Sequence, residues 1–204
     1  LVPAGEFLMG TAEDYYTGCS AYTSWHPSPD KYAVFPSEKP QHKVRITKPF
    51  FLWVGVNEPR KNLSRIIESW RTYKDDFDLV LVGSAGLDQV KSEQGIKKLG
   101  GVGMTELAAL YAGATGLVFP SLYEGFGLPI LEAFQYGCPV ITSNISGMAE
   151  VAADAAFLVD PSDVDSIRQG IDDLTQQRDT AAACLVKLGS RRLRQRGVSI
   201  AVSY

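Results

Sequence analysis

Two adjacent basic residues, Arg60 and Lys61, lie in the segment Gly55–Asn62, between an apolar run and the start of an amphipathic stretch. Positive side chains are unusual near the start of a helix, because the helix dipole favours anions there. The pair is explained if this segment binds a phosphate group, since backbone N–H groups, the dipole and both cations would then act on one anion. The alternative is a solvated pair of cations in a surface turn, and the spacing alone leaves both interpretations open.

A second segment with residue types suited to ligand binding is Pro120–Pro129, where two glycines flank one aromatic residue. Glycine lets the backbone approach a ligand closely. Glu124 lies in this segment and Glu132 in the first turn of the helix expected after it. A carboxylate is a natural partner for the vicinal hydroxyls of a ribose or a sugar ring. The alternative is that Glu124 is a surface acid and Glu132 complements the helix dipole, which is the simpler explanation of Glu132 taken alone.

Other candidate segments favour structural roles. The glycine-rich segments Val82–Gly86 and Gly100–Gly103 lack the lysine of a P-loop and the G-x-G-x-x-G spacing, so tight turns are favoured over nucleotide contacts. Cys138 precedes a buried strand and has no histidine near it in sequence, so we expect it in the core. No histidine follows His42, which excludes histidine-based acid-base chemistry and a histidine-containing metal site in the α/β part.

The segments that would position these residues alternate between two patterns from Phe50 onward. Short apolar runs, typical of strands buried on both faces, are separated by stretches with a helical apolar period. This alternation predicts an α/β fold with a doubly wound parallel sheet, in which ligands bind outside the carboxyl ends of the strands. The expected strands are Phe50–Val56, Leu79–Val82, Gly116–Phe119, Pro139–Thr142 and Ala156–Val159, with a weaker one near Ile96–Leu99. The expected helices are Leu63–Tyr73, Thr105–Ala112, Pro129–Tyr136 and Val164–Leu174.

Composition excludes several other classes of protein. The chain has 204 residues, of which 45% are hydrophobic and 21% charged, as in an ordinary globular domain. A formal net charge of −3 argues against a nucleic-acid partner, and we interpret the basic segment Lys187–Arg196 as a solvated helix face. The 3 cysteines are too few and too scattered for a disulfide framework or a zinc cluster. With no transmembrane or signal pattern, we expect a cytoplasmic protein, with a peripheral position at the inner membrane face as an alternative.

Several segments agree in sequence, spacing and order with one known family. The chain resembles the donor-binding C-terminal half of GT-B glycosyltransferases over about residues 50–186, most closely the retaining enzymes of family 4. Glu124 and Glu132 match the E-x7-E motif of that family. The resemblance implies a Rossmann-like domain, one half of a GT-B fold. The matching segments are GVNEPRKN (55–62), LVG (81–83), LAALYAGA (107–114), FPSLYEGFGLPILEA (119–133), PVITSNISGMAE (139–150) and 155–163.

The resemblance also implies a role for each candidate residue. Lys61, beside Arg60, would bind the donor diphosphate and stabilise negative charge on the leaving group. Glu124 would contact the transferred sugar and act with Lys61 in catalysis, whereas Glu132 would bind ribose hydroxyls. Neither a metal ion nor another cofactor is implied. The other donor-binding positions are Gly83 and Val102, by the nucleoside, and Gly125, Phe126, Gly127 and Leu128, by the sugar and phosphates.

The implied substrates are a GDP-, UDP- or ADP-linked sugar and an acceptor sugar, lipid or polysaccharide. Three departures from the family pattern matter: Val56 stands where many members have arginine, the stretch between Gly86 and Gly100 is short, and the N-terminal acceptor-binding domain is missing. A complete enzyme would transfer the sugar to an acceptor hydroxyl. The alternatives are a non-catalytic nucleotide-sugar-binding module, a truncated or chimeric fragment with no activity alone, and an interaction role without nucleotide affinity.

Residues 1–49 differ from the rest, since they are rich in Pro, Gly, Ser, Thr and aromatic residues and predict turns, short strands and loop. Two stretches, Val2–Gly10 and Glu38–Phe51, resemble the opening strands of the formylglycine-generating (sulfatase-modifying factor) family. This resemblance stops before the catalytic cysteines of that family, so no functional residue is carried over. We therefore expect two units, 1–49 and 50–204, and favour a fusion over a divergent N-terminal extension.

Overall fold

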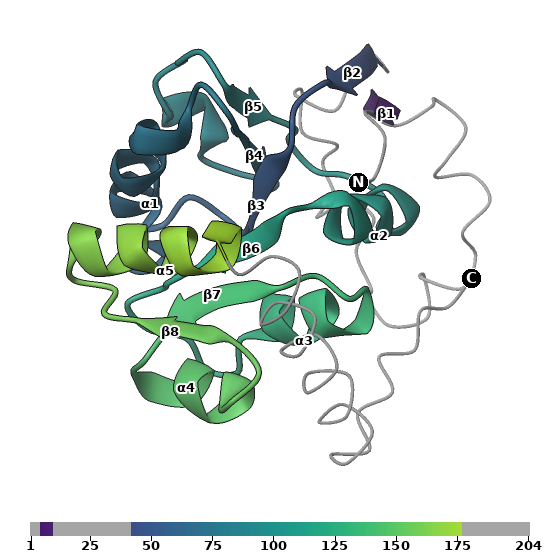
Figure 1. The fold of residues 1–204 in the computed structure, drawn as a ribbon. Helices are drawn as coiled ribbons and strands as arrows, with labels where there is room; N and C mark the ends of the chain where they lie inside the picture. Colours follow the sequence, from purple (N-terminus) through teal and green to yellow (C-terminus); the bar gives the residue numbers. More distant parts are fainter. Residues whose placement is uncertain (1–4, 10–41, 177–204) are drawn as a thin grey trace, which may run out of the picture.

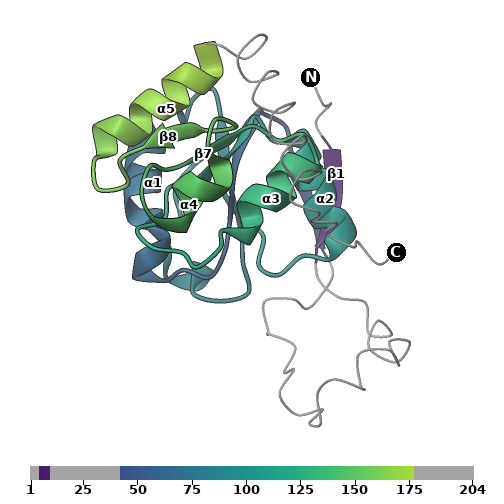
Figure 2. The same ribbon diagram turned by 90° about the horizontal axis from the view of Figure 1, so that it is seen from below.

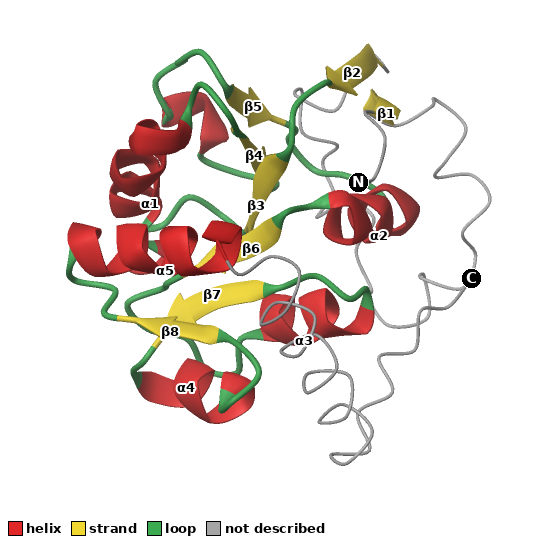
Figure 3. Ribbon diagram, viewed as in Figure 1, coloured by secondary structure: helices red, strands yellow, loops and turns green. Residues whose placement is uncertain are grey.

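The structure is a computed structural model of the chain, and it describes residues 5–9 and 42–176. Its centre is a parallel sheet of 6 strands in the order β5-β4-β3-β6-β7-β8, with helices on both faces (Figures 1 and 3). The strands are β3 (Phe50–Val54), β4 (Asp78–Val82), β5 (Ile96–Lys98), β6 (Gly116–Phe119), β7 (Val140–Ser143) and β8 (Phe157–Val159). The helices are α1 (Leu63–Trp70), α2 (Met104–Gly113), α3 (Leu128–Gln135), α4 (Ser146–Ala152) and α5 (Val164–Gln176).

Each face of the sheet has its own apolar core. Successive side chains of a strand point to opposite faces, so Leu52 and Trp53 of β3 belong to different clusters. On one face the strands pack against α2, α3 and α4, and on the other they pack against α1 and α5 (Figure 2). Burial on both faces explains why the four central strands, β3, β4, β6 and β7, are mostly apolar. The predicted α/β class with a doubly wound parallel sheet is confirmed.

Most predicted elements lie within two residues of the observed ones at both ends. β3 ends at Val54, two residues before the predicted end, and the predicted helix Leu63–Tyr73 continues beyond α1 as a 3-10 turn, Arg71–Tyr73. Helix α4 was not predicted, because its small residues, SGMAEVA, carry little helical apolar period. Its buried Met148 and Val151 show that packing against the sheet stabilises it.

The N-terminal strands form a separate antiparallel pair, in which β1 (Gly5–Met9) pairs with β2 (His42–Ile46). Short strands were expected in this part of the chain. Ile46, the last residue of β2, is buried in the core on the α2–α3 face. Cys19 and the basic segment Lys187–Arg196 lie outside the described residues. Within the described part of the chain, every helix is too short or too polar to cross a membrane.

Candidate functional site

The two loops that sequence analysis singled out follow neighbouring strands at the centre of the sheet. β4 and β5 lie on one side of β3, while β7 and β8 lie on the other side of β6, so the strand order reverses between β3 and β6. Open α/β sheets bind ligands at the carboxyl ends of strands at such a reversal. The loops are joined directly, because the backbone N–H of Leu122 donates to the carbonyl oxygen of Arg60 at 2.7 Å.

This arrangement brings Arg60, Lys61 and Glu124 into contact. The Lys61 Nζ lies 2.6 Å from Glu124 Oε1, and the Arg60 Nη1 lies 2.8 Å from the same oxygen. Arg60 also donates from Nε to Glu58 Oε2 at 2.7 Å. One carboxylate oxygen therefore serves two cations contributed by a loop 64 residues away in sequence.

The Lys61–Glu124 pair is largely withdrawn from water. The exposed fractions of the two side chains are 10% and 11%, and the Lys61 Nζ lies 4.6 Å from the ring centroid of Phe119. A buried charge is costly unless it is paired. Arg60, with 42% of its side chain exposed, is the solvated member of the cluster. Lys61 therefore depends on an anionic partner, and Glu124 is that partner in the structure.

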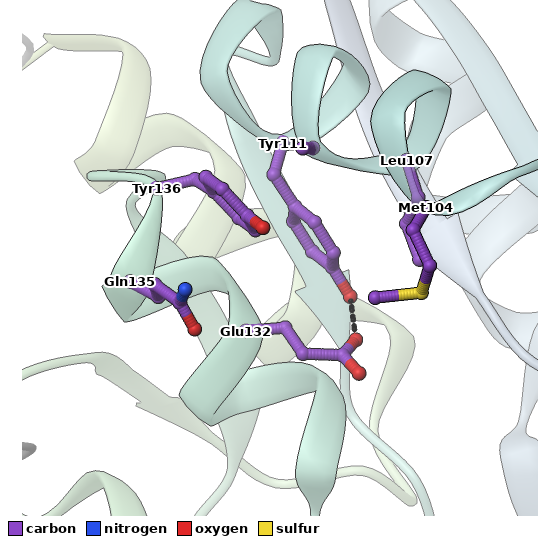
Figure 4. Close-up of a pocket in the computed structure, with 7 residues that line it drawn as sticks. Met104, Leu107, Tyr111, Glu132, Gln135 and Tyr136 are labelled. Atoms are coloured by element: carbon purple, nitrogen blue, oxygen red, sulfur yellow. Dashed lines mark hydrogen bonds between the residues drawn. The ribbon is translucent and has the colours of Figure 1, made fainter. Parts of the chain in front are cut away.

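Glu132 lies on α3 and contacts a different residue. The Tyr111 hydroxyl, from α2, donates to Glu132 Oε2 at 2.8 Å (Figure 4). Burial and the nearby charge of Glu132 raise the pKa of Tyr111 far above its usual value, so the phenol stays protonated and remains a donor. Glu132 thus keeps Oε1 for another partner. A shallow hollow between α2 and α3 is lined by Met104, Leu107, Ala108, Tyr111, Glu132, Gln135 and Tyr136.

The segment after Glu124 leaves space at the surface. A Cβ added at Gly125 would meet no atom within 4 Å. Gly127 has φ of +70°, a conformation that favours glycine, and α3 begins directly after it. Phe126 and Leu128 expose large apolar side chains on either side of Gly127. This open backbone is what the proposed sugar contacts would require.

Gly83 and Val102 lie at the carboxyl ends of β4 and β5. A Cβ added at Gly83 would lie 1.8 Å from the carbonyl oxygen of Gly55, so the two backbones meet at van der Waals distance. The Gly83 N–H donates to Gly100 O at 2.8 Å. Val102 is partly buried against the core on the α2–α3 face. Both residues have evident packing roles, and their contact with a nucleoside stays a prediction.

Gly83→Ala is expected to lower the free energy of unfolding by about 3 kcal/mol, because the new methyl group overlaps backbone atoms that cannot move independently. Urea denaturation measures the change. Gly125→Ala is the matched control and should change stability little, since its site is open. Equal stability of the two variants would contradict the close packing of Gly83 on Gly55.

Sequence analysis missed two residues that shape the site, Asn62 and Tyr111. Asn62 is 1% exposed, has a left-handed backbone and bonds to two other loops. An asparagine directly before an apolar helix is a recognisable signal for a helix N-cap, yet its amide caps nothing here. Tyr111 lies in the segment LAALYAGA, but nothing local indicates that its hydroxyl meets Glu132.

Two further observations concern metal binding and Cys138. Among residues 5–9 and 42–176, no group of three or more His, Cys, Asp or Glu side chains is placed to hold a metal ion.

Cys138 is buried, and burial raises the pKa of its thiol to about 12. A thiol that stays protonated is a poor nucleophile, in keeping with the predicted core position.

The sequence and the fold are similar to those of known proteins. The O-antigen chain mannosyltransferase B of Escherichia coli is 38% identical over 131 residues, which cover 58% of this chain and 34% of that protein. The O-antigen chain mannosyltransferase RfbU of Salmonella typhimurium is 34% identical over 139 residues, covering 64% and 39%. The structure of sucrose-phosphate synthase from Thermosynechococcus elongatus matches with a TM-score of 0.65 and 25% identity, over 72% of this chain and 41% of that one.

The chain thus spans little more than a third of the length of these curated relatives. The model of the family described as "Glycosyl transferases group 1" matches residues 34–185. This match covers both loops of the site and begins within the segment 1–49 that sequence analysis set apart. The chain belongs to the group 1 family of glycosyl transferases.

Proposed function

We propose that residues 50–186 form the donor-binding half of a retaining glycosyltransferase. In the complete enzyme this half would bind a nucleotide diphosphate sugar, and the glycosyl group would pass to an acceptor hydroxyl with its anomeric configuration kept. The observation that carries the proposal is the cluster of Arg60, Lys61 and Glu124 where the strand order reverses. Cations and a carboxylate are both needed there, because the donor carries a diphosphate next to a polyhydroxyl ring.

In this mechanism Lys61 and Arg60 hold the diphosphate, and Lys61 stabilises the negative charge that grows on it as the glycosidic bond breaks. A cation in a site shielded from water stabilises such charge more than one in bulk solvent. Glu124 contacts the hydroxyls of the transferred sugar, and the backbone of Gly125–Gly127 approaches the sugar and phosphates. Glu132 accepts hydrogen bonds from the ribose through Oε1, the oxygen that Tyr111 leaves free.

We further propose mannose as the transferred sugar. Two of the similar proteins are named mannosyltransferases, at 38% and 34% identity over 131 and 139 residues. The acceptor, a sugar, lipid or polysaccharide, would be bound by a second, N-terminal domain. In support, exposed apolar side chains gather after β5, β6 and β7, at the carboxyl edge of the sheet that such a domain would face: Met104, Tyr123, Phe126, Leu128 and Ile145.

A thermal-shift series on the purified chain tests donor binding. We expect a rise in melting temperature with GDP, UDP or ADP and a further rise with the matching nucleotide sugar, because a ligand that binds only the folded state stabilises it. A clean melting transition without any shift would contradict the donor site. Transfer and hydrolysis assays then separate an enzyme from the second candidate, a nucleotide-sugar-binding module, which would bind the donor without turning it over.

Tyr111→Phe is expected to reduce the preference for ribonucleotides over 2′-deoxynucleotides. Glu132 would bind the ribose hydroxyls with its carboxylate held in place by the Tyr111 hydroxyl. A hydrogen bond to a charged group contributes about 1.5–3 kcal/mol, and the lower value corresponds to a preference of about 10-fold in the original protein, which we expect to fall to about 3-fold in the variant. Calorimetric titration with a nucleoside diphosphate and its 2′-deoxy form measures it.

Tyr136→Phe is the control for this prediction. The ring of Tyr136 stacks on that of Tyr111 with centroids 6.0 Å apart. Tyr136→Phe also removes one tyrosine hydroxyl, but it leaves the hydrogen bond between Tyr111 and Glu132 in place. It should keep the full preference for ribose. A Tyr111→Phe variant that also kept it would show that the hydroxyl does not orient Glu132.

We also infer that residues 1–49 are a separate unit, derived from a formylglycine-generating domain. In support, β1 and β2 coincide with the two stretches that resemble that family, and they pair with each other outside the parallel sheet. A version of the chain that begins at Lys43, which retains Ile46, should keep the melting temperature and any nucleotide-induced shift of the parallel-sheet domain. A large drop in melting temperature would show that the two parts form one folding unit.

A further inference from the structure

Asn62 occupies an unusual position between Lys61 and the first turn of α1. Its side chain and backbone are buried, with 1% of the residue exposed, and its backbone is left-handed with φ of 60° and ψ of 25°. Its N–H donates to Pro59 O at 3.2 Å, and its own carbonyl oxygen accepts from the Ile66 N–H at 3.2 Å. Asn62 therefore closes the 3-10 turn that carries Lys61 and opens the helix that follows.

The side-chain amide of Asn62 joins three parts of the chain. Its Nδ2 donates to Pro120 O at 2.9 Å and to Pro161 O at 2.6 Å, and its Oδ1 accepts from Arg65 Nη1 at 2.9 Å. Both amide hydrogens and the amide oxygen are thus used. The two carbonyl partners lie 58 and 99 residues away in sequence.

These bonds bear directly on the cluster of Arg60, Lys61 and Glu124. Lys61 precedes Asn62 in the chain, and Pro120 begins the loop that carries Glu124. Pro161 follows β8, so the amide also ties this pair of loops to the far edge of the sheet. We propose that Asn62 is a positioning residue that sets the Lys61 ammonium group against Glu124, and thereby against the donor diphosphate, an inference that rests on the proposed function.

Asparagine suits this position for two physical reasons. It adopts the left-handed conformation more readily than most residues with a side chain. It also supplies two N–H donors on a short side chain, whereas an ionised aspartate of the same shape supplies none, and glycine has the backbone freedom but no amide. A displacement of about 1 Å between catalytic groups can lower a rate by about 100-fold, so a bond network of this kind affects transfer as well as folding.

The test is a double-mutant cycle on the full chain, measured by urea denaturation. The coupling between Lys61 and Glu124 is obtained from Lys61→Met, Glu124→Gln and the double variant, first in the original sequence and then in an Asn62→Gly background. Glycine keeps the left-handed backbone and removes only the amide. Because coupling is measured within each background, a general loss of stability cancels out.

Ser69→Ala supplies the matched background. Ser69 is a buried polar residue of α1 whose hydroxyl shares its one hydrogen between Arg65 O at 2.8 Å and Val164 O at 3.1 Å, so its loss also removes a contact between segments distant in sequence. It leaves the Asn62 amide in place. If Asn62→Gly does not fold, Asn62→Asp takes its place, because aspartate keeps an oxygen for Arg65 and loses both donors.

We expect the coupling to be lost in the Asn62 background and retained in the Ser69 background. Retention in both would overturn the positioning role. This measurement requires no ligand, so its result is separate from that of the donor-binding test. In an enzyme assay that detects transfer, Asn62→Gly should lower kcat at least 10-fold with little change in KM. Equal changes in kcat for Asn62→Gly and Ser69→Ala would also overturn the positioning role.

Discussion

Glu124→Gln is expected to tighten the binding of a nucleoside diphosphate and to weaken that of the matching nucleotide sugar. Glu124 Oε1 lies 2.6 Å from Lys61 Nζ and 2.8 Å from Arg60 Nη1, so this carboxylate occupies the cations that the diphosphate needs. A diphosphate must share them with a negative charge that water screens poorly, because Glu124 and Lys61 are both about nine-tenths buried. Glutamine keeps the shape and removes that charge.

The two ligands should respond in opposite directions. Removing the repulsion between the Glu124 carboxylate and a bound diphosphate is worth about 1–2 kcal/mol. We therefore expect roughly 10-fold tighter binding of the nucleoside diphosphate. The nucleotide sugar should lose roughly 10-fold, because a neutral amide accepts more weakly than a carboxylate from the sugar hydroxyls. Calorimetric titration of both ligands measures the two constants.

Glu58→Gln is the matched control for this prediction. Glu58 bonds to Arg60 Nε, but 46% of its side chain is exposed, so solvent screens its charge. Its neutralisation should change both affinities less than 3-fold. If Glu124→Gln instead weakened the two ligands equally, Glu124 would be a structural counter-ion of Lys61 and not a sugar-contacting residue.

Lys61→Met is expected to lower the affinity for a nucleoside diphosphate by about 100-fold, close to the upper value for loss of a hydrogen bond to a charged group. Methionine retains the apolar stem that lies near Gly55 and lacks the ammonium group that lies over the Phe119 ring, so the change is confined to that group. Any transfer rate should fall further, by about another 100-fold, since the charge on the leaving group would lose its stabilisation.

Lys48→Met is the control for Lys61→Met. Lys48 lies before β3, at the opposite end of that strand from the site, where its Nζ donates to Asp75 O at 2.8 Å. It should leave nucleotide affinity unchanged. Unchanged affinity in Lys61→Met and in Glu132→Ala together would remove the donor site from these two loops.

Much of the fold is encoded locally. The apolar runs predicted β3, β4, β6 and β7 within two residues at either end, because strands buried on both faces are apolar along most of their length. Helix α4 was not predicted for the opposite reason: its small residues carry no such pattern, and its stability comes from packing of three buried residues, Met148, Val151 and Ala152. A hydrophobic pattern therefore predicts a strand or helix only where most of that element's own side chains must be buried.

The residue types of the site were also visible in the sequence. A basic pair before an apolar helix, and two acids around a glycine-containing loop, were identified as candidates for phosphate and hydroxyl binding, and resemblance to a family gave each a role. Their grouping was not visible. Glu124 meets Arg60 and Lys61, whereas Glu132, eight residues further along, meets Tyr111 on a different helix.

By itself, then, the sequence determined the class of fold, the chemistry available in two loops and the family that these motifs resemble. Only the tertiary structure decided which groups act together. Arg60 and Glu124 are 64 residues apart, and Asn62 bonds to carbonyl groups 58 and 99 residues away. Such contacts depend on strand order, which places β3 beside β6 and is set by the packing of the whole sheet rather than by any local pattern.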